Sequence, residues 1–318
     1  MSGKSTGRIV GALLIALAAA IAGSAWFFAT HLKTPGYVHR TPEQGLHPRD
    51  APPFAMAHWG GLLGNPREAL GLAYQDVEFA AVDGSTLRGW FIPSATASSE
   101  AVVTVHGGQS DRRSFLRHVP MLHRAGYPLL LFDYREHGIS DGASRGIAFG
   151  WRAHHDVSSA VAYMKDARSF ERVAVIGTSM GAVSSILAAA GNPAIDVVIA
   201  ENPFASAADV LGDAEFFDRL PGWYRELVAF FVRLHFDVLD EREAIDVVDR
   251  IAPRPLLLMH GTQDQAVAVW QSEALFRKAG QPKELWILEG AEHTALFNLA
   301  PAEYERRVVG FLDRHLRE

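Results

Sequence analysis

Residues 172–181 read RVAVIGTSMG, and an alanine-rich segment follows them. The apolar first half of this stretch predicts a buried strand, and residues 180–190 predict a helix. Ser179 would then lie on a tight strand-to-helix turn with a glycine two residues away on either side. Such a turn brings backbone segments too close together for a side chain at Gly177 or Gly181. We expect the Ser179 hydroxyl to emerge beside the positive end of the helix dipole, which favours a developing negative charge.

The chain around this stretch alternates short apolar runs with longer amphipathic segments. Near-continuous Val, Ile and Leu runs are typical of strands buried on both faces of a mostly parallel sheet. The predicted strands are 77–82, 87–92, 101–105, 128–132, 172–176, 195–200, 255–259 and 284–288. The predicted helices are 113–125, 151–168, 180–190, 269–279 and 301–316. This alternation predicts an α/β fold with a central sheet flanked by helices, preceded by a hairpin that turns at Asp83 and Gly84.

A serine hydroxyl is a weak nucleophile until a base takes its proton, so a histidine is needed near Ser179. His293 follows the last predicted strand and would lie at the carboxyl edge of the sheet, where Ser179 also emerges. An acid should orient this imidazole. Asp264 follows the strand 255–259 at the same edge, in the chain order Ser, Asp, His that a nucleophile elbow implies. Glu201, at the end of the preceding strand, is the alternative acid.

The same chemistry needs backbone amides that bind a developing oxyanion. One donor is expected to be the N–H of Met180, directly after the serine. The second should come from the loop after the strand 101–105, where we expect Gly108, with Gln109 as the neighbouring alternative. His106 in this loop is expected to be a structural hydrogen-bonding residue.

Taken together, these motifs resemble the α/β-hydrolase superfamily, and most of all its monoacylglycerol-lipase-like and serine-aminopeptidase-like serine hydrolases. The resemblance covers roughly residues 75 to 316 and rests on five segments in the same order, namely His106-Gly107-Gly108, residues 132–140, Gly177-Thr178-Ser179-Met180-Gly181, residues 260–264 and Glu292-His293. It implies a hydrolase without a cofactor. The chain departs from the family at Glu136, where relatives commonly have glycine.

About fifty residues separate the strands 195–200 and 255–259, which is too long for a structureless loop in a compact domain. We expect a helical insertion over about residues 204–250, forming a lid at the carboxyl edge of the sheet. Its aromatic residues either cover a pocket or fill a local core. They are Phe204, Phe216, Phe217, Trp223, Tyr224, Phe230, Phe231 and Phe236. Residues 74–318 would then form the hydrolase domain, and the Pro- and Gly-rich residues 31–73 a linker that wraps toward it.

The N-terminal segment 1–30 differs from the rest of the chain. Lys4 and Arg8 precede an uncharged, mostly apolar run over residues 9–30, which is just long enough to span a membrane. We predict an uncleaved anchor, with the hydrolase domain on the outer, periplasmic or extracytoplasmic side. The alternative is a signal peptide cleaved at the small residues 23–25, which would leave a secreted protein starting near Trp26.

Composition excludes several other classes of protein. The chain has no cysteine, which removes a cysteine nucleophile, thiolate metal sites and disulfides. The net charge of −6 is spread along the chain without a basic stripe, so we expect no nucleic-acid partner. The histidines and the aspartate available for metal binding are His118, His123, His137, His154, His155 and Asp156. Because adjacent helical residues point in different directions, we expect His154 and His155 not to share an ion, and we expect no metal site.

The sequence therefore predicts a serine hydrolase that cleaves a carboxylic ester, with a lipid or acyl-glycerol as a possible substrate. A serine aminopeptidase or an acyltransferase would use the same three side chains. A binding protein on a hydrolase scaffold is the alternative of another class, because fold alone does not determine function.

Overall fold

The structure is a computed structural model that describes residues 3–32, 40–47, 49, 51–52, 54–142, 146–213 and 219–317. In these ranges eight strands form one sheet in the order β1-β2-β4-β3-β5-β6-β7-β8. The strands are β1 (Gln75–Ala80), β2 (Thr86–Ile92), β3 (Glu100–Val105), β4 (Leu129–Asp133), β5 (Arg172–Thr178), β6 (Val197–Glu201), β7 (Leu256–Gly261) and β8 (Lys283–Leu288). Only β2 runs antiparallel to its neighbours β1 and β4, and all other pairs are parallel. This confirms the predicted, mostly parallel sheet.

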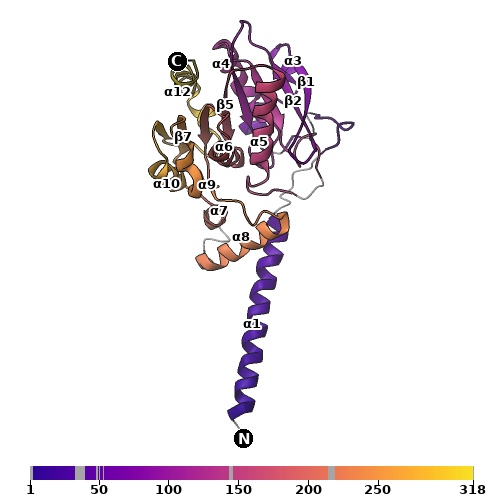
Figure 1. Cartoon of the computed structure of the whole chain (residues 1–318), viewed down its shortest axis with the longest axis vertical. Coiled ribbons are helices and arrows are strands. Elements are labelled where there is room, and N and C mark those ends of the chain that lie inside the picture. The colour runs from indigo at the N-terminus through magenta and orange to yellow at the C-terminus, as the bar shows by residue number, and fades with distance from the viewer. Residues whose placement is uncertain are drawn as a thin grey trace.

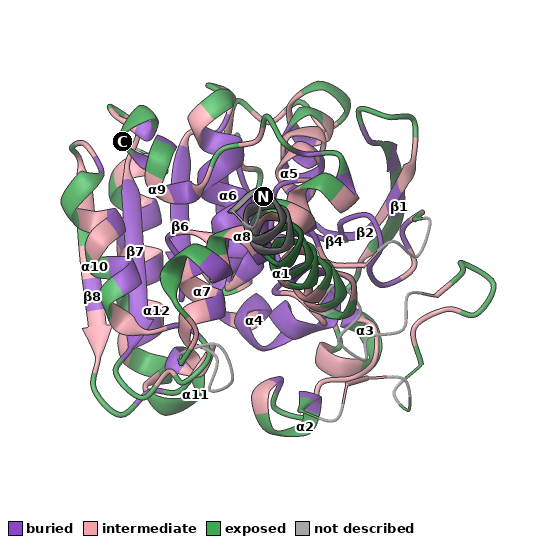
Figure 2. Cartoon of the chain, turned by 90° about the horizontal axis from the view of Figure 1, so that it is seen from below, coloured by how far each residue is buried: buried purple, intermediate pink, exposed green. Residues whose placement is uncertain are grey.

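Helices cover both faces of this sheet (Figure 1). Those of the domain body are α4 (Val119–Arg124), α5 (Ala153–Ala162), α6 (Met180–Gly191), α10 (Val269–Lys278), α11 (Leu296–Leu299) and α12 (Pro301–Leu312). Short π-helical turns extend α5 and α12 over Tyr163–Ala167 and Asp313–Arg317. The buried residues are concentrated in the central strands and in α6 (Figure 2).

Strand β5 shows how the core is divided by the sheet. Val173 and Val175 belong to the apolar cluster that contains Val157 of α5 and Ile186 of α6. Ala174 and Ile176 belong to the cluster on the other face, which contains residues of α4 and α12. Because side chains alternate along a strand, a continuous apolar run serves both layers at once.

The prediction of one helix over residues 113–125 was wrong. Residues Arg112–His118 form a 3₁₀ helix, and α4 begins only at Val119. Pro120 has no N–H and would remove a hydrogen bond from a continuous α-helix, which accounts for a break at this point. The side chain of Asp111 also caps the 3₁₀ helix by accepting a hydrogen bond from the N–H of Arg113 at 3.0 Å.

Between β6 and β7 the chain forms mostly helices. They are α7 (Ala207–Asp213), α8 (Gly222–Phe236), α9 (Ala244–Val247) and a 3₁₀ turn at Val248–Ile251. Two of the aromatic residues expected to cover a pocket, Phe216 and Phe217, lie outside the described residues. Phe236 is almost fully buried in the core.

The N-terminal helix α1 (Gly3–Leu32) projects from the domain, and α8 lies against the end of α1 that enters it (Figure 1). The hydroxyl groups of Ser24 and Tyr224 are 2.7 Å apart. The rings of Trp26 and Phe231 meet edge to face with a centroid distance of 5.7 Å. Tyr224 and Phe231 of α8 therefore contact α1.

The residues expected to form a linker contain two short helices, α2 (Ala55–His58) and α3 (Pro66–Leu70). The Arg113 guanidinium donates hydrogen bonds to the carbonyls of His47 and Leu63, at 2.8 and 3.3 Å. Trp59, which is 2% exposed, lies with its ring centroid 5.6 Å from the Arg113 guanidinium carbon. The described part of this segment therefore packs on the domain.

Candidate active site

Ser179 occupies a strained turn between β5 and α6. Its backbone has φ 53° and ψ −122°, a conformation that residues with a side chain rarely adopt. A Cβ atom at Gly177 would lie 2.3 Å from the Gly181 carbonyl oxygen, and one at Gly181 would lie 2.2 Å from that of Val105. Both flanking positions thus require glycine because backbone passes directly beside them.

We expect Gly181→Ala to lower the free energy of unfolding by about 3 kcal/mol or more, since the added methyl group would collide with backbone that cannot move aside. Denaturant unfolding of the full chain measures this effect. Gly191→Ala, at the other end of α6, is the matched control, because nothing lies within 4 Å of a Cβ there. It should change stability by less than about 1 kcal/mol. Equal effects in the two variants would contradict the close approach at Gly181.

The structure brings Ser179, His293 and Asp264 together at the carboxyl edge of the sheet. His293 Nε2 lies 2.9 Å from Ser179 Oγ. On the other side of the ring, His293 Nδ1 lies 2.7 Å from Asp264 Oδ2. The three side chains form one hydrogen-bonded chain, although the serine and the histidine are 114 residues apart in sequence.

The Asp264 carboxylate is held by further donors. The backbone N–H groups of Ala266 and Val267 donate to Oδ1 at 2.9 and 2.8 Å, and Asn202 Nδ2 donates to Oδ2 at 2.6 Å. His260 Nε2 lies 3.2 Å from Oδ2. The sequence reasoning assigned no role to Asn202 or His260, although both follow or end strands at the same sheet edge.

Glu201, the alternative acid, lies elsewhere. It is completely buried, and its Oε2 accepts a hydrogen bond from the Tyr304 hydroxyl at 2.9 Å. Burial raises the pKa of this carboxyl, against the opposing effect of the nearby Arg117 charge. Among the described contacts, only Asp264 reaches the Nδ1 atom of His293.

Asp264 should make stability depend on acid pH. Burial alone would raise the pKa of its carboxyl, but hydrogen bonds from His260 and His293 outweigh burial and hold the pKa well below its usual value. In the unfolded chain the carboxyl titrates near pH 3.9. Below about pH 4 the unfolded chain therefore binds a proton that the folded chain does not, and the free energy of unfolding falls.

We accordingly expect Asp264→Asn to lose less stability than the wild type between about pH 5 and pH 3, because the amide does not titrate. Denaturant unfolding at a series of pH values measures the two slopes. Parallel curves for the two proteins would contradict the lowered pKa.

The loop after β3 lies directly against the serine turn. A Cβ at Gly107 would be 3.4 Å from Ser179 Cβ, and one at Gly108 would be 3.8 Å from Met180 Sδ. The residues expected to supply the oxyanion amides, Met180 and Gly108, therefore lie beside each other and both line the cavity at Ser179.

His106, in the same loop, is completely buried and stacks on Tyr134 with a centroid distance of 4.0 Å. Its Nδ1 donates a hydrogen bond to the Gly107 carbonyl at 2.8 Å. Burial lowers the pKa of this imidazole, in spite of the nearby Asp133 carboxylate. These contacts agree with a structural role.

Glu136, the departure from the family pattern, has φ 68°. This is the left-handed region, which glycine occupies without strain. A glycine, which the family resemblance leads us to expect here, would suit this backbone. The carboxylate of Glu136 lies 3.6 Å from the Arg152 guanidinium, away from the three clustered side chains.

A cavity of about 530 Å³ opens at Ser179 and His293. Its apolar wall includes Ile147, Phe149 and, from the insertion, Phe204, Val210 and Leu211. Phe54, His58 and Trp59 close another side. Sequence reasoning missed these three residues because it treated residues 31–73 as a linker. The closely spaced aromatic residues Phe54 and Trp59 within that Pro-rich stretch were the signal that could have indicated a packed segment.

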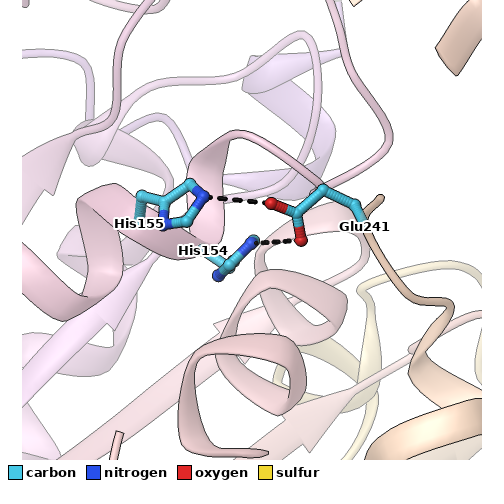
Figure 3. A group of neighbouring side chains, drawn as sticks. All are labelled: His154, His155 and Glu241. Atoms are coloured by element: carbon cyan, nitrogen blue, oxygen red, sulfur yellow. Dashed lines mark hydrogen bonds and ion pairs between the residues drawn. The ribbon is translucent and has the colours of Figure 1, made fainter. Parts of the chain in front are cut away.

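His154 and His155, at the start of α5, were expected not to share an ion. Their side chains nevertheless turn toward one common carboxylate. Their Nε2 atoms lie 2.9 and 3.1 Å from the two carboxylate oxygens of Glu241 (Figure 3). Adjacent side chains can converge because Glu241 reaches between them from the segment after α8, and its carboxylate offers one oxygen to each ring.

Two curated relatives cover most of this chain. YqkD of Bacillus subtilis, an uncharacterized protein, is 28% identical over 239 residues, which cover 72% of this chain and 76% of YqkD. YfhR of Escherichia coli O157:H7, also uncharacterized, is 29% identical over 251 residues, which cover 75% of this chain and 80% of YfhR.

Solved structures share the fold. The esterase Pf2001 of Pyrococcus furiosus superposes with a TM-score of 0.66 at 28% identity, covering 79% of this chain and 94% of the esterase. Est1E of Butyrivibrio proteoclasticus, solved with ferulic acid, gives a TM-score of 0.61 at 20% identity, covering 76% and 100%. At that identity the second likeness concerns the fold alone.

Residues 102–307 match the description "Alpha/beta hydrolase family". With the sheet topology and the serine turn described above, this match places the chain in the alpha/beta hydrolase family.

Proposed function

We propose that this protein is a serine hydrolase that cleaves carboxylic esters through an acyl-enzyme, with Ser179, His293 and Asp264 as its catalytic triad. The observation that carries the proposal is the hydrogen-bonded chain from Asp264 through His293 to Ser179 at the mouth of an apolar cavity. The likeness to an esterase at 28% identity supports it.

In the proposed first step, His293 Nε2 takes the proton of Ser179 as Oγ attacks the ester carbonyl carbon. Asp264 stabilises the imidazolium that forms. The carbonyl oxygen becomes an oxyanion, and the amides of Met180 and Gly108 donate hydrogen bonds to it. His293 then gives its proton to the leaving alcohol as the ester C–O bond breaks, which leaves an acyl group on Ser179.

In the second step a water molecule takes the place of the alcohol. His293 removes a proton from this water, the hydroxide adds to the acyl carbon, and the proton returns to Ser179 Oγ as the carboxylic acid leaves. An acceptor alcohol in place of water would make the same site an acyltransferase.

The cavity supports an ester with an apolar acyl chain, such as a lipid or acyl-glycerol ester. Phe149, Phe204 and Leu211 offer apolar contacts beside Ser179. A serine aminopeptidase needs an anionic group to bind the substrate's ammonium group, and no Asp or Glu is among the described residues that line the cavity. We therefore prefer an ester to a peptide substrate. The family resemblance by itself is compatible with both, because it includes lipase-like and aminopeptidase-like members.

A chain-length series of nitrophenyl esters, run beside aminoacyl nitroanilides, tests this substrate class. We expect ester turnover to exceed amide turnover and to rise with acyl length until the cavity is filled. A preference for the amides would contradict the proposal. A fluorophosphonate probe separates an enzyme from a binding protein on the same scaffold, because the binding protein would not be labelled.

We further propose that α1 anchors the protein in a membrane, with the hydrolase domain on the outer side. Among the described residues, one helix is long and apolar enough to span a bilayer, over Gly11–His31. Cleavage after residue 25 would divide the part of α1 that packs on the domain, where Ala25 and Ala29 are buried. Mass spectrometry of the membrane fraction tests the anchor, and a mature chain that begins near Trp26 would contradict it. Protease access to the domain in spheroplasts tests the orientation.

An anchor in α1 would place α8 at the membrane surface. A span of about 20 residues that starts at Ile9 ends near Phe28, and α1 already contacts α8 at Ser24. The side chains of Trp223, Phe230 and Leu234 on α8 are 58%, 47% and 45% exposed. Their spacing puts them on one helix face, which suits insertion among lipid headgroups.

We therefore expect brominated lipids to quench the fluorescence of Trp223 in vesicles that contain the full chain. The contribution of Trp223 is the fluorescence quenching of the wild type minus that of Trp223→Phe. Trp270→Phe is the matched control, because Trp270 on α10 is also exposed, at 43%, but lies on a different helix. Quenching of Trp270 without quenching of Trp223 would contradict this placement of α8.

A further inference from the structure

Two chain segments that the proposed reaction does not use meet at a cluster of three ligand-type side chains. His154 and His155 belong to the first turn of α5, and Glu241 belongs to the segment between α8 and α9. The imidazole centroids are 3.9 Å apart, and both rings turn toward the same carboxylate (Figure 3). One ligand atom from each of the three residues lies within 4.8 Å of the others.

The surroundings hold this arrangement in place. The Arg233 guanidinium of α8 donates a hydrogen bond to the Glu241 carbonyl, which fixes the backbone that carries the carboxylate. The side chains of His154 and Glu241 are 14% and 25% exposed, and that of His155 is 44% exposed. The cluster is thus shielded on one side and accessible from solvent on the other.

Both oxygens of the Glu241 carboxylate are directed at imidazole nitrogens. Oε2 lies 2.9 Å from His154 Nε2, and Oε1 lies 3.1 Å from His155 Nε2.

We propose that His154, His155 and Glu241 bind one Zn²⁺ ion, or a divalent transition metal of similar preference. Imidazole nitrogen and carboxylate oxygen are ligands that zinc prefers, whereas Mg²⁺ and Ca²⁺ select oxygen ligands. Zinc bonds of about 2.0–2.1 Å separate neighbouring tetrahedral ligands by about 3.3 Å. The two imidazole nitrogens lie 2.9 and 3.1 Å from different oxygens of Glu241, and one ligand atom from each residue lies within 4.8 Å of the others. Zinc binding therefore requires the three side chains to rearrange around the ion.

In the bound state each imidazole uses its Nε2 lone pair and carries its proton on Nδ1, and a water molecule completes the tetrahedron. The ion lies away from the cavity at Ser179, because none of its three ligands lines that cavity. Its effect is structural. It fastens the segment after α8, and with it the insertion, to helix α5 of the domain body. His154 and Glu241 are 87 residues apart in sequence, so one ion closes a long loop.

Calorimetric titration of the chelator-treated, detergent-solubilised full chain with zinc sulfate tests the site. We expect one zinc ion per chain to bind at this cluster, and Glu241→Gln and His155→Ala each to weaken that binding about 100-fold or more. Zinc should also raise the Tm of the wild type by several degrees at concentrations far above Kd, but not that of Glu241→Gln. With Cu²⁺ in place of zinc, the electron paramagnetic resonance spectrum should show hyperfine coupling to the imidazole nitrogens. The spectrum of His155→Ala should show coupling to one imidazole fewer than that of the wild type.

His123→Ala is the matched control for adventitious surface binding, because His123 lies on α4, outside this cluster. It should bind zinc as the wild type does. Zinc bound instead by His293 and Asp264 would still bind to Glu241→Gln, so this variant distinguishes that site from the cluster. Ester turnover and the metal-free Tm show whether each variant is folded. The proposal is overturned if the wild type takes up no zinc, or if folded Glu241→Gln binds it with unchanged affinity and Tm gain.

Discussion

Ser179→Ala is expected to lower kcat for ester hydrolysis by about 10⁶-fold, because the proposed acyl-enzyme cannot form without the Oγ nucleophile. The fold should persist. Serine and alanine both carry a Cβ, so the strained backbone at φ 53° costs the two residues the same. Steady-state turnover of a nitrophenyl ester and labelling by a fluorophosphonate probe measure the loss.

Ser159→Ala is the matched control for this substitution. Ser159 lies on α5, outside the cavity, and its hydroxyl donates to the His155 carbonyl at 3.1 Å. This variant should keep wild-type turnover and labelling. Turnover or labelling that survives in Ser179→Ala would remove Ser179 as the nucleophile and favour a binding protein or another site.

Asp264→Asn is expected to lower kcat by about 10⁴-fold. The N–H groups of Ala266 and Val267 require an acceptor at the position of Oδ1. The amide NH₂ of the asparagine would therefore take the position of Oδ2 and face His293 Nδ1. Nδ1 would have to accept a hydrogen bond, which puts the ring proton on Nε2, where it blocks proton transfer from Ser179.

Glu201→Gln separates the two acids that the sequence leaves open. Because Glu201 Oε2 contacts the Tyr304 hydroxyl, this variant should keep activity within about tenfold of the wild type. Turnover is to be compared at saturating ester, with the Tm of each variant as a check of folding. Retained activity in Asp264→Asn together with loss in Glu201→Gln would reverse the assignment.

Local sequence predicted the parts of the fold that depend on local patterns. The Asp83-Gly84 turn indicated the first two strands, and short apolar runs indicated the other six, to within a few residues. The central strands are apolar at almost every position because they are buried on both faces. Gly177, Ser179 and Gly181 indicated the turn, since only glycine tolerates the backbone contacts there. The order of segments then put Ser179, Asp264 and His293 at one edge of the sheet.

Only the tertiary structure decided what meets across long sequence separations. It turned Asp264 rather than Glu201 toward His293, and it brought Trp59 from a Pro-rich segment to the cavity. It also set Glu241 between two adjacent histidines. Sequence patterns report the conformation and burial of one segment. The partner of a buried side chain depends on how separate segments pack, which no local periodicity encodes.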